Sequence, residues 1–256
     1  MKNQHVRFIM DTEEFFRAIS PLVQDDRQNS SPRVQILRRM RTLLREDPCP
    51  DVAGMASLRK LKLLNLAVGC LPENGKECYL EVGSFQGKSL VAALADNSHA
   101  HAVACDNFTL FDDPNSPKNL DILKQNLARY RLSERVQFFD CDFRELLTSW
   151  NVRQLPRVGV YFYDGAHDEE SQFLGVRMAE DLLADNAVVI VDDWRHAKDS
   201  ESYAEAGTKR AISDSPNEWS IRHVLPARYN GDLELWWNGV GVLRFKRVQP
   251  MPDQMM

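Results

Sequence analysis

From residue 75 onward, short apolar runs alternate with longer stretches in which apolar residues recur every three or four positions. The short runs have the length of buried strands, and the longer stretches have the period of amphipathic helices. We predict strands at 78–83, 101–105, 136–139, 158–163 and 187–191, and helices at 88–96, 117–131, 143–150 and 169–184. Near-continuous apolar strands separated by helices predict a parallel sheet that is covered by helices on both faces.

The two ends of the chain depart from this alternation. Before residue 75, the segments 11–19, 32–45 and 55–70 have the apolar period of helices. Near the C-terminus, residues 219–225, 233–237 and 240–247 are strand-like, and Asn238-Gly239 between the last two is a strong signal for a β-hairpin turn. We therefore predict a helical extension over residues 1–74, then one α/β domain over residues 75–256 whose mostly parallel sheet ends in an antiparallel hairpin.

Composition narrows the class of protein. Of the 256 residues, 43% are hydrophobic and 27% are charged, which is ordinary for a globular protein and excludes a disordered chain. The net charge of −5 disfavours a nucleic-acid partner, because binding of the phosphate backbone relies on clustered positive charge. The apolar runs are far shorter than the roughly 20 residues of a membrane helix. Five cysteines without a CxxC pair fit buried thiols in a reducing compartment, so we expect a soluble cytoplasmic protein.

The first predicted strand leads into a turn with two glycines, Gly83 and Gly87, and then into a helix. The turn is one residue too short for a P-loop and lacks the G-x-G-x-x-G spacing of a dinucleotide-binding turn. Glu81, two positions before the first glycine of G-x-x-x-G, completes a pattern that resembles motif I of the class I S-adenosylmethionine-dependent methyltransferases. Glycine suits a turn whose backbone a ligand must approach closely. A purely structural strand-to-helix turn is the alternative.

This resemblance implies both a fold and a cofactor. The family has a Rossmann-like, doubly wound fold with a seven-stranded sheet, and the backbone of this turn holds the methionyl part of S-adenosylmethionine. The cofactor-binding residues that the resemblance implies in the turn are Glu81, Gly83, Ser84, Gly87 and Ser89.

Acidic residues stand at the ends of the next two predicted strands. Asp106 ends the second strand, and ligands of open α/β sheets bind outside the carboxyl ends of the strands. A carboxylate there suits a ribose diol because it accepts hydrogen bonds from both hydroxyl groups. The resemblance assigns that role to Asp106, and it places Asp142, after the third strand, beside the adenine ring. Capping of the next helix is the alternative for both residues, and Asp140 is a rival for the role of Asp142.

Three carboxylates, Asp164, Asp192 and Asp193, stand at the ends of the fourth and fifth predicted strands. In the strand order of the family these strands are neighbours and point the same way, so the carboxylates would converge beside the cofactor. Converging carboxylates repel one another, and Mg²⁺, which prefers oxygen ligands, relieves that repulsion. The lack of a His/Cys cluster in the sequence argues against zinc. The alternative to a metal site is that these acids cap the next helix, and Asp193 alone could do so.

The sequence D-G-x-H at the fourth strand, with an Asp-Asp pair at the end of the fifth, resembles a metal-dependent branch of small-molecule O-methyltransferases. That branch includes enzymes that methylate sugar hydroxyls of macrolide and aminocoumarin antibiotics, and the resemblance spans roughly residues 76–195. It implies that Asp164, Asp192 and Asp193 hold Mg²⁺, with Asp164 also beside the cofactor. Of the candidates for the base that takes the hydroxyl proton, His167 comes first because imidazole titrates near neutral pH, and Asp164 comes second. The alternative for His167 is a cap or surface residue of the next helix.

Aromatic residues after the fifth strand are candidates for the wall of an acceptor pocket. Two of them are adjacent in a predicted strand and would point to opposite faces of the sheet. The polar segment 195–207 is a candidate lid. The aromatic candidates are Trp194, Trp236, Trp237, Tyr203 and Tyr229.

These features predict transfer of a methyl group from S-adenosylmethionine to a hydroxyl oxygen of a small molecule such as a sugar, a phenol or a natural product, with Mg²⁺ assistance. Three alternatives stay open: a metal-independent methyltransferase acting on nitrogen or on a macromolecule, a non-catalytic cofactor-binding module, and a metal-dependent hydroxylase or hydrolase. The identity of the acceptor and the oligomeric state also stay open. The N-terminal helices suit either a cover over the active site or an interface in a homo-oligomer.

Overall fold

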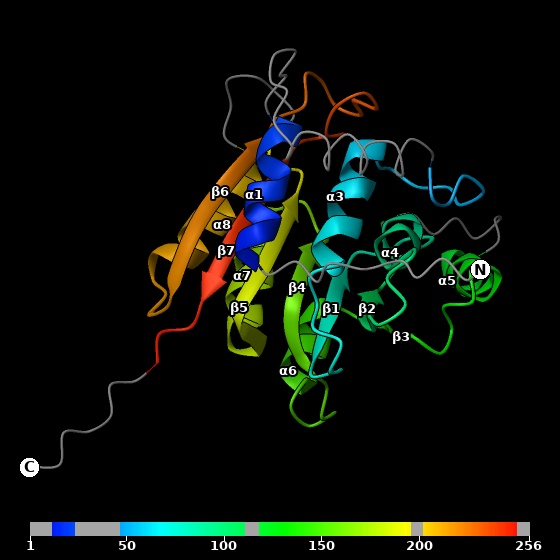
Figure 1. Ribbon diagram of the computed structural model, residues 1–256, viewed down its shortest axis with the longest axis horizontal. Helices are drawn as coiled ribbons and strands as arrows, with labels where there is room; N and C mark the ends of the chain where they lie inside the picture. The colour runs from blue at the N-terminus through cyan, green and yellow to red at the C-terminus, as the bar shows by residue number, and fades with distance from the viewer. Residues whose placement is uncertain (1–11, 24–46, 111–117, 196–201, 250–256) are drawn as a thin grey trace, which may run out of the picture.

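The computed structural model describes residues 12–23, 47–110, 118–195 and 202–249 (Figure 1). The strands are β1 (Glu77–Val82), β2 (Ala102–Asp106), β3 (Val136–Asp140), β4 (Arg157–Tyr163), β5 (Leu183–Asp192), β6 (Glu218–Leu225) and β7 (Val240–Lys246). The helices are α1 (Thr12–Val23), α3 (Leu58–Val68), α4 (Lys88–Leu94), α5 (Asn119–Arg129), α6 (Phe143–Ser149), α7 (Glu169–Ala179) and α8 (Tyr203–Ser213), and the 3₁₀ turn η1 (Glu180–Leu182) continues α7. The helix predicted over 32–45 lies outside the described residues.

All seven strands form one sheet in the order β3-β2-β1-β4-β5-β7-β6. The strands β1 to β5 pair in parallel, and β7 pairs antiparallel with both β5 and β6. The prediction of a mostly parallel, doubly wound sheet is therefore confirmed. After β3 the chain returns to the other side of β1, so the direction of winding reverses between β1 and β4. Ligands of such sheets bind at this point, outside the carboxyl ends of the strands.

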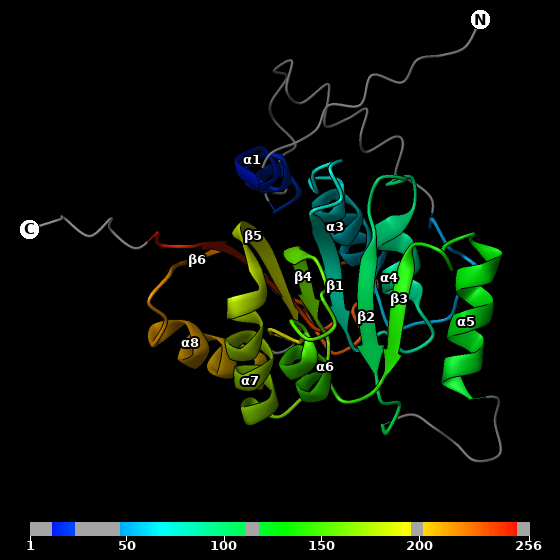
Figure 2. The same cartoon turned by 90° about the horizontal axis from the view of Figure 1, so that it is seen from below.

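Helices cover both faces of the sheet (Figure 2). The helices α1, α3, α4 and α5 contribute to the core on one face, and α6, α7 and α8 contribute to the core on the other. Side chains of the central strands alternate between the two cores: Phe162 of β4 packs on the α3 side, whereas Tyr161 and Tyr163 pack on the α7 side. This alternation explains why the central strands are apolar along their whole length.

The C-terminal hairpin is present, but its strands differ from the prediction. It is formed by β6 and β7, and residues 226–239 connect them. The predicted strand at 233–237 is wrong: this segment is a turn, closed by an isolated bridge between Asp232 and Trp237. Gly239 has a positive φ, but Asn238-Gly239 does not form the predicted two-residue turn between paired strands. Leu233 is exposed, whereas Trp236 is buried and Leu235 is partly buried, and both of these pack with the α3-side core rather than in a strand pair.

A helix occupies part of the segment predicted as a lid. Residues 203–213 form α8, which packs against α7, and residues 196–201 lie outside the described part of the chain. The packing is close at Gly207, where an added Cβ would meet backbone atoms of α7. Ser202 caps α8 and Glu205 is buried within it, so the described part of the segment belongs to a packed helix and does not form a lid.

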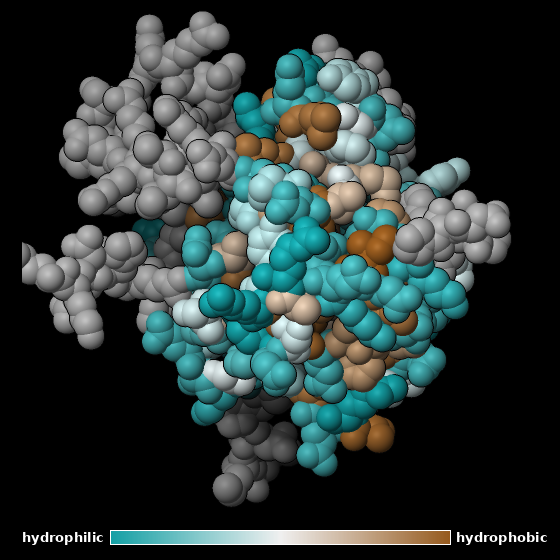
Figure 3. All heavy atoms as spheres, turned by 90° about the vertical axis from the view of Figure 1, so that its right-hand side faces the viewer, coloured by the Kyte–Doolittle hydropathy of each residue, from teal (hydrophilic) through white to brown (hydrophobic). Residues whose placement is uncertain are grey.

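Within the described residues, no helix combines the length and the apolar character that crossing a membrane requires. Figure 3 shows the end of the molecule that carries α5. Its surface is mostly hydrophilic, and hydrophobic residues occur there in separate patches. This end therefore offers apolar contacts only in small areas.

The boundary proposed at residue 74 stays a prediction, but α3 packs directly on α4 and shares its core.

Candidate functional site

A cavity of about 220 Å³ opens at the carboxyl ends of β1, β2, β4 and β5. It lies where the winding of the sheet reverses, as expected for a ligand site in this architecture. Its walls bring together residues that are far apart in the sequence. Those used below are Lys60, Gly83, Asp106, Asp164, His167 and Trp237.

The glycine turn forms one wall of the cavity. Gly83 and Gly87 both have left-handed backbone conformations, with φ of +85° and +87°, which glycine adopts without strain. A Cβ on Gly83 would overlap the backbone oxygen of Asp164, so the turn packs directly on the chain that leaves β4. A Cβ on Gly87 would meet only the Leu123 side chain, at 3.6 Å. Gly83 is therefore required by a close backbone approach, whereas Gly87 serves the conformation that starts α4.

Glu81 lies beneath the turn and not in the cavity wall. Its side chain is fully buried, and its carboxylate accepts hydrogen bonds from the Tyr79 hydroxyl at 2.5 Å and the Ser89 hydroxyl at 3.0 Å. Burial raises the pKa of Glu81 to about 7, although these hydrogen bonds oppose the shift. Ser84 and Ser89, by contrast, line the cavity. Glu81 thus supports the turn from below, and its assignment to cofactor binding stays a prediction.

We expect Glu81→Gln to flatten the pH dependence of stability. The folded-state pKa is about 7 and the ordinary value 4.5, so the folded protein holds a proton that the unfolded chain releases. The free energy of unfolding therefore falls as the pH rises through this window, by about 3 kcal/mol in total from this group. Denaturant unfolding at about pH 5 and about pH 8 measures the loss, which Glu81→Gln should remove. The exposed Glu73→Gln is the control, and an equal slope in both variants would contradict the assignment.

Asp106, the last residue of β2, and Asp142, which follows β3, both line the cavity, and they make different hydrogen bonds. The carboxylate of Asp106 accepts hydrogen bonds from the backbone N–H groups of Phe85, at 2.8 Å, and Phe108, at 2.7 Å. Asp142 caps α6 through the Arg144 N–H and also contacts the Arg144 guanidinium, as its capping alternative predicted. The rival Asp140 is exposed and does not line the cavity.

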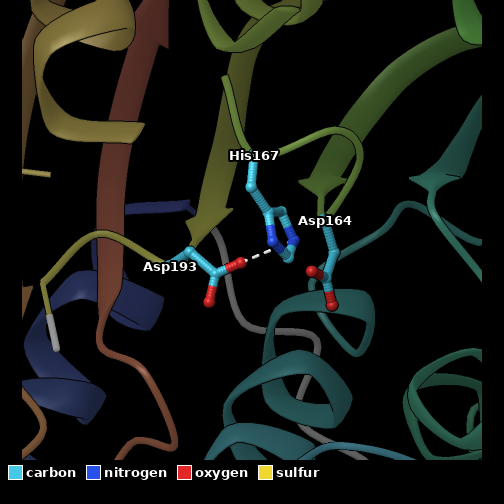
Figure 4. Close-up of side chains that lie close together, drawn as sticks. All are labelled: Asp164, His167 and Asp193. Carbon is cyan, nitrogen blue, oxygen red and sulfur yellow. Dashed lines mark ion pairs between the residues drawn. The ribbon is translucent and has the colours of Figure 1, made fainter. Parts of the chain in front are cut away.

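Asp164, His167 and Asp193 converge at the ends of β4 and β5 (Figure 4). The His167 Nε2 lies 2.8 Å from Asp193 Oδ2, and one ligand atom from each of the three residues lies within 4.8 Å of the others. The side-chain amide of Asn238 donates to the second oxygen of Asp193 at 2.6 Å. Asp193 is thus held from two sides, and its orientation toward His167 is fixed.

Asp192 does not belong to this group, although its carboxyl group interacts with that of Asp164, and it contacts a residue that the sequence prediction missed. Its carboxylate accepts a hydrogen bond from the ammonium group of Lys60, which is 1% exposed and belongs to α3. A weak signal was present in the sequence. Lys60 precedes Leu63, Leu64 and Ala67 at helical spacing, so a lysine stands in the apolar stripe that faces the core.

The charges of the cluster shift its pKa values in opposite directions. Burial and the charge of Asp192 raise the pKa of Asp164 well above its ordinary range, although Lys60 opposes them. The hydrogen bond to Asp193 raises the pKa of His167 despite partial burial. Burial raises the pKa of Asp193, but the hydrogen bond and charge of His167 outweigh it, so the net pKa is lowered. The contact between His167 and Asp193 therefore favours the protonated form of the imidazole and the ionised form of the carboxylate.

The donor atoms allow a test of whether Mg²⁺ suits this cluster. Mg²⁺ is commonly bound by one or two carboxylates and keeps several water molecules, so the carboxylates of Asp164 and Asp193 suffice for it. The imidazole of His167 is less suited to Mg²⁺ than an oxygen ligand. The structure therefore brings together two of the three predicted carboxylate ligands, and it places Asp192 against Lys60.

One of the aromatic residues predicted for an acceptor pocket lines the cavity. Trp237 does so, next to Asn238, in a left-handed backbone conformation held by the bridge to Asp232. Trp194 and Trp236 are buried among core residues, whereas Tyr203 and Tyr229 are exposed and do not line the cavity.

Comparisons with known proteins agree with this fold. Residues 80–194 match a family model described as a methyltransferase domain. The chain has no significant match among curated protein sequences. The matched segment contains the glycine turn and all the predicted carboxylates.

Solved structures show the same fold at low sequence identity. The cofactor-bound protein Rv0187 from MTB is 19% identical with a TM-score of 0.59, over 87% of this chain and 100% of that one. An O-methyltransferase from Bacillus cereus in complex with SAH is 18% identical with a TM-score of 0.56, over 90% and 97%. The O-methyltransferase TomG from Streptomyces achromogenes, involved in tomaymycin synthesis, is 17% identical with a TM-score of 0.53, over 96% and 100%. The chain therefore has a Rossmann-like methyltransferase fold, and its residues 80–194 are similar to the methyltransferase domain family.

Proposed function

We propose that the protein transfers the methyl group of S-adenosylmethionine to a hydroxyl oxygen of a small molecule. The observation that carries the proposal is the 2.8 Å contact between His167 and Asp193, in the same cavity as the glycine turn and Asp106. In this proposal, His167 serves as the base and the glycine turn with Asp106 holds the cofactor, so one bound acceptor could reach both. The structural likeness to two O-methyltransferases, one in complex with SAH and one with SAM, supports this choice.

The His167–Asp193 pair suits removal of a hydroxyl proton. A neutral imidazole that donates from Nε2 to the Asp193 carboxylate presents Nδ1 as its acceptor atom. As the proton moves to His167, the hydroxyl oxygen attacks the methyl carbon, the carbon–sulfur bond breaks, and S-adenosylhomocysteine leaves. Asp193 fixes the orientation of the ring and stabilises the imidazolium that forms, and Asn238 holds Asp193 in place.

We include Mg²⁺ in the proposal, held by the carboxylates of Asp164 and Asp193. When bound, the ion would lower the pKa of an acceptor hydroxyl group and so help the base. His167 is 53% exposed at the side chain, which leaves it accessible to the acceptor while Asp193, at 15%, stays largely covered. Asp164 remains the second candidate for the base.

The acceptor we propose is a small molecule with a flat or ring-shaped part. Trp237 lines the cavity and offers a surface against which a sugar or aromatic ring can pack, which supports this choice of acceptor. The net charge of −5 supports the exclusion of nucleic acid as acceptor, and we place the reaction in the cytoplasm. Assembly of the chain into a homo-oligomer stays a proposal.

The first experiment is calorimetric titration with S-adenosylhomocysteine, on the unmodified protein and on Asp106→Asn. We expect binding that weakens at least about tenfold in Asp106→Asn, because the ribose hydroxyls lose a charged acceptor. Asp140→Asn, which changes an exposed acid at the neighbouring strand, is the control and should bind normally. Absence of binding to the unmodified protein would exclude a methyltransferase.

The second experiment measures transfer of labelled methyl groups to a panel of hydroxylated acceptors and their amine analogues, with and without EDTA. Transfer to the hydroxyl compounds that EDTA abolishes supports the full proposal. Transfer that resists EDTA supports a metal-independent enzyme, and transfer to amines alone supports the nitrogen alternative. Cofactor binding without transfer to any acceptor supports the non-catalytic alternative.

A further inference from the structure

Lys60 is a buried cation at the edge of the carboxylate cluster, and it comes from outside the segment that matches the methyltransferase model. It lies on α3, and its side chain is 1% exposed. Its ammonium group contacts the Asp192 carboxylate and donates to the backbone oxygen of Met55 at 3.2 Å. Asp164 Oδ2, whose carboxyl group also interacts with that of Asp192, is 3.9 Å from the same ammonium group. The lysine therefore lies beside two of the three carboxylates at the ends of β4 and β5, and it is closer to Asp192.

A lysine in such a place is costly unless its charge is compensated. Removal of an ammonium group from water disfavours its charged form, and nearby carboxylates favour it. For Lys60, burial lowers the pKa, but the charges of Asp192 and Asp164 outweigh it. Asp192 itself is 2% exposed, so each member of the pair depends on the other for its charge.

The same contact has a consequence for cation binding. A carboxylate that is paired with an ammonium group is a poorer ligand for a divalent ion, because the ion would have to displace a like charge from it. The two remaining carboxylates, on Asp164 and Asp193, already converge with His167. We propose that Lys60 is a positioning residue of the cluster, which holds Asp192 out of the cation site and limits the carboxylate ligands to Asp164 and Asp193.

The position of Lys60 also links the segment before β1 to the site. The Met55 carbonyl that accepts from Lys60 belongs to a stretch whose residues Gly54, Met55 and Ala56 line the cavity. Ser57, which caps α3, donates from its hydroxyl to the backbone oxygen of Leu235 at 2.6 Å. The start of α3 is thus tied both to the cluster and to the connection that carries Trp237 and Asn238.

The test is a titration with Mn²⁺ alone, followed by the electron paramagnetic resonance signal of the free ion, without cofactor or acceptor. Lys60→Met removes the charge and keeps the length of the side chain. We expect it to bind Mn²⁺ at least about tenfold more tightly than the unmodified protein, because one positive charge is lost and the Asp192 carboxylate is released. Lys62→Met, on the same helix but outside the cavity wall, is the matched control and should leave the affinity unchanged.

The double variant separates this inference from the simpler view that Asp192 is itself a ligand. Asp192→Asn alone should weaken Mn²⁺ binding under both views, since it leaves an uncompensated ammonium group near Asp164. Lys60→Met with Asp192→Asn should return the affinity to within about threefold of the unmodified protein if Asp192 is no ligand. An affinity as low as that of Asp192→Asn alone would overturn the inference. So would a Lys60→Met variant that binds no more tightly than the unmodified protein.

Folding is monitored in the same samples. Each single variant leaves one buried charge without its partner, so the midpoint of urea unfolding should fall in both and recover in the double variant. If Lys60→Met does not fold, the affinity of the double variant alone decides between the two views. If the unmodified protein binds no Mn²⁺, binding by Lys60→Met would still support the inference, and absence of binding in all variants would overturn it.

Lys60 can act in this way only if the cation site exists, so the inference rests on the proposed function. The two can nevertheless fail separately, because the titration contains no acceptor. Failure of methyl transfer with the expected order of Mn²⁺ affinities would remove the proposed function and keep the role of Lys60. If methyl transfer requires a cation but Lys60→Met binds Mn²⁺ no more tightly than the unmodified protein, the proposed function is kept and the role of Lys60 is removed.

Discussion

Replacing Gly83 by alanine is expected to abolish cofactor binding. The new Cβ would overlap the backbone oxygen of Asp164, and neither backbone segment can move without disturbing the other. The φ of +85° adds about 1–2 kcal/mol of strain for a residue with a side chain. Displacement of Asp164 would also disturb the carboxylate cluster that follows β4. We expect at least about 100-fold weaker binding of S-adenosylhomocysteine, equivalent to about 2.7 kcal/mol.

Gly87→Ala is the matched control for this prediction. Its φ of +87° imposes a similar strain, but its Cβ would meet only Leu123, at 3.6 Å. We therefore expect at most about a tenfold loss of affinity, measured by the same calorimetric titration. Equal losses in the two variants would show that conformational strain, and not the close approach of the two backbones, makes glycine necessary in this turn.

His167→Gln is expected to lower kcat by a factor of about 10²–10⁴ while cofactor affinity stays unchanged. Glutamine preserves a hydrogen bond to Asp193 but cannot accept the hydroxyl proton at neutral pH. The measurement is the rate of methyl transfer with saturating acceptor, together with titration of S-adenosylhomocysteine. His101→Gln, which changes an exposed histidine near the amino end of β2, is the control.

Saturating Mg²⁺ distinguishes the two roles that His167 could have. If the imidazole is a metal ligand, excess Mg²⁺ should restore much of the rate in His167→Gln, because the two carboxylates can still bind the ion. If the imidazole is the base, the rate should stay low at every Mg²⁺ concentration. A rate within about threefold of the unmodified protein would exclude both roles and move the assignment to Asp164.

The parallel part of the fold could be predicted from the sequence because its signals are local. Each strand from β1 to β5 is a short apolar run, and each intervening helix has an apolar period that a few neighbouring residues define. The glycine turn and the acids Asp106, Asp164 and Asp193 stand at strand ends, and parallel strands bring their carboxyl ends to one edge. The cavity therefore lies where the spacing of these residues places it.

The C-terminal errors arose where the local signal was ambiguous. Apolar residues at 233–237 are compatible with a strand, but in the structure this segment is a turn that the Asp232–Trp237 bridge closes. The segment after β5 looked like a polar lid because the contact that makes α8 a packed helix is with α7, which is distant in the sequence. Contacts between segments that are distant in the sequence do not produce a recognisable hydrophobic period in a short polar stretch.

The sequence by itself determined the doubly wound sheet, the glycine turn and the row of acids at its edge, because alternation and turn chemistry act between near neighbours. Only the tertiary structure decided how the acids are paired. Asp192 and Asp193 are adjacent in the chain, yet one contacts Lys60 of α3 and the other contacts His167 after β4. Adjacent residues at a strand end point in different directions, so the partner of each is set by the elements packed on either side of the sheet.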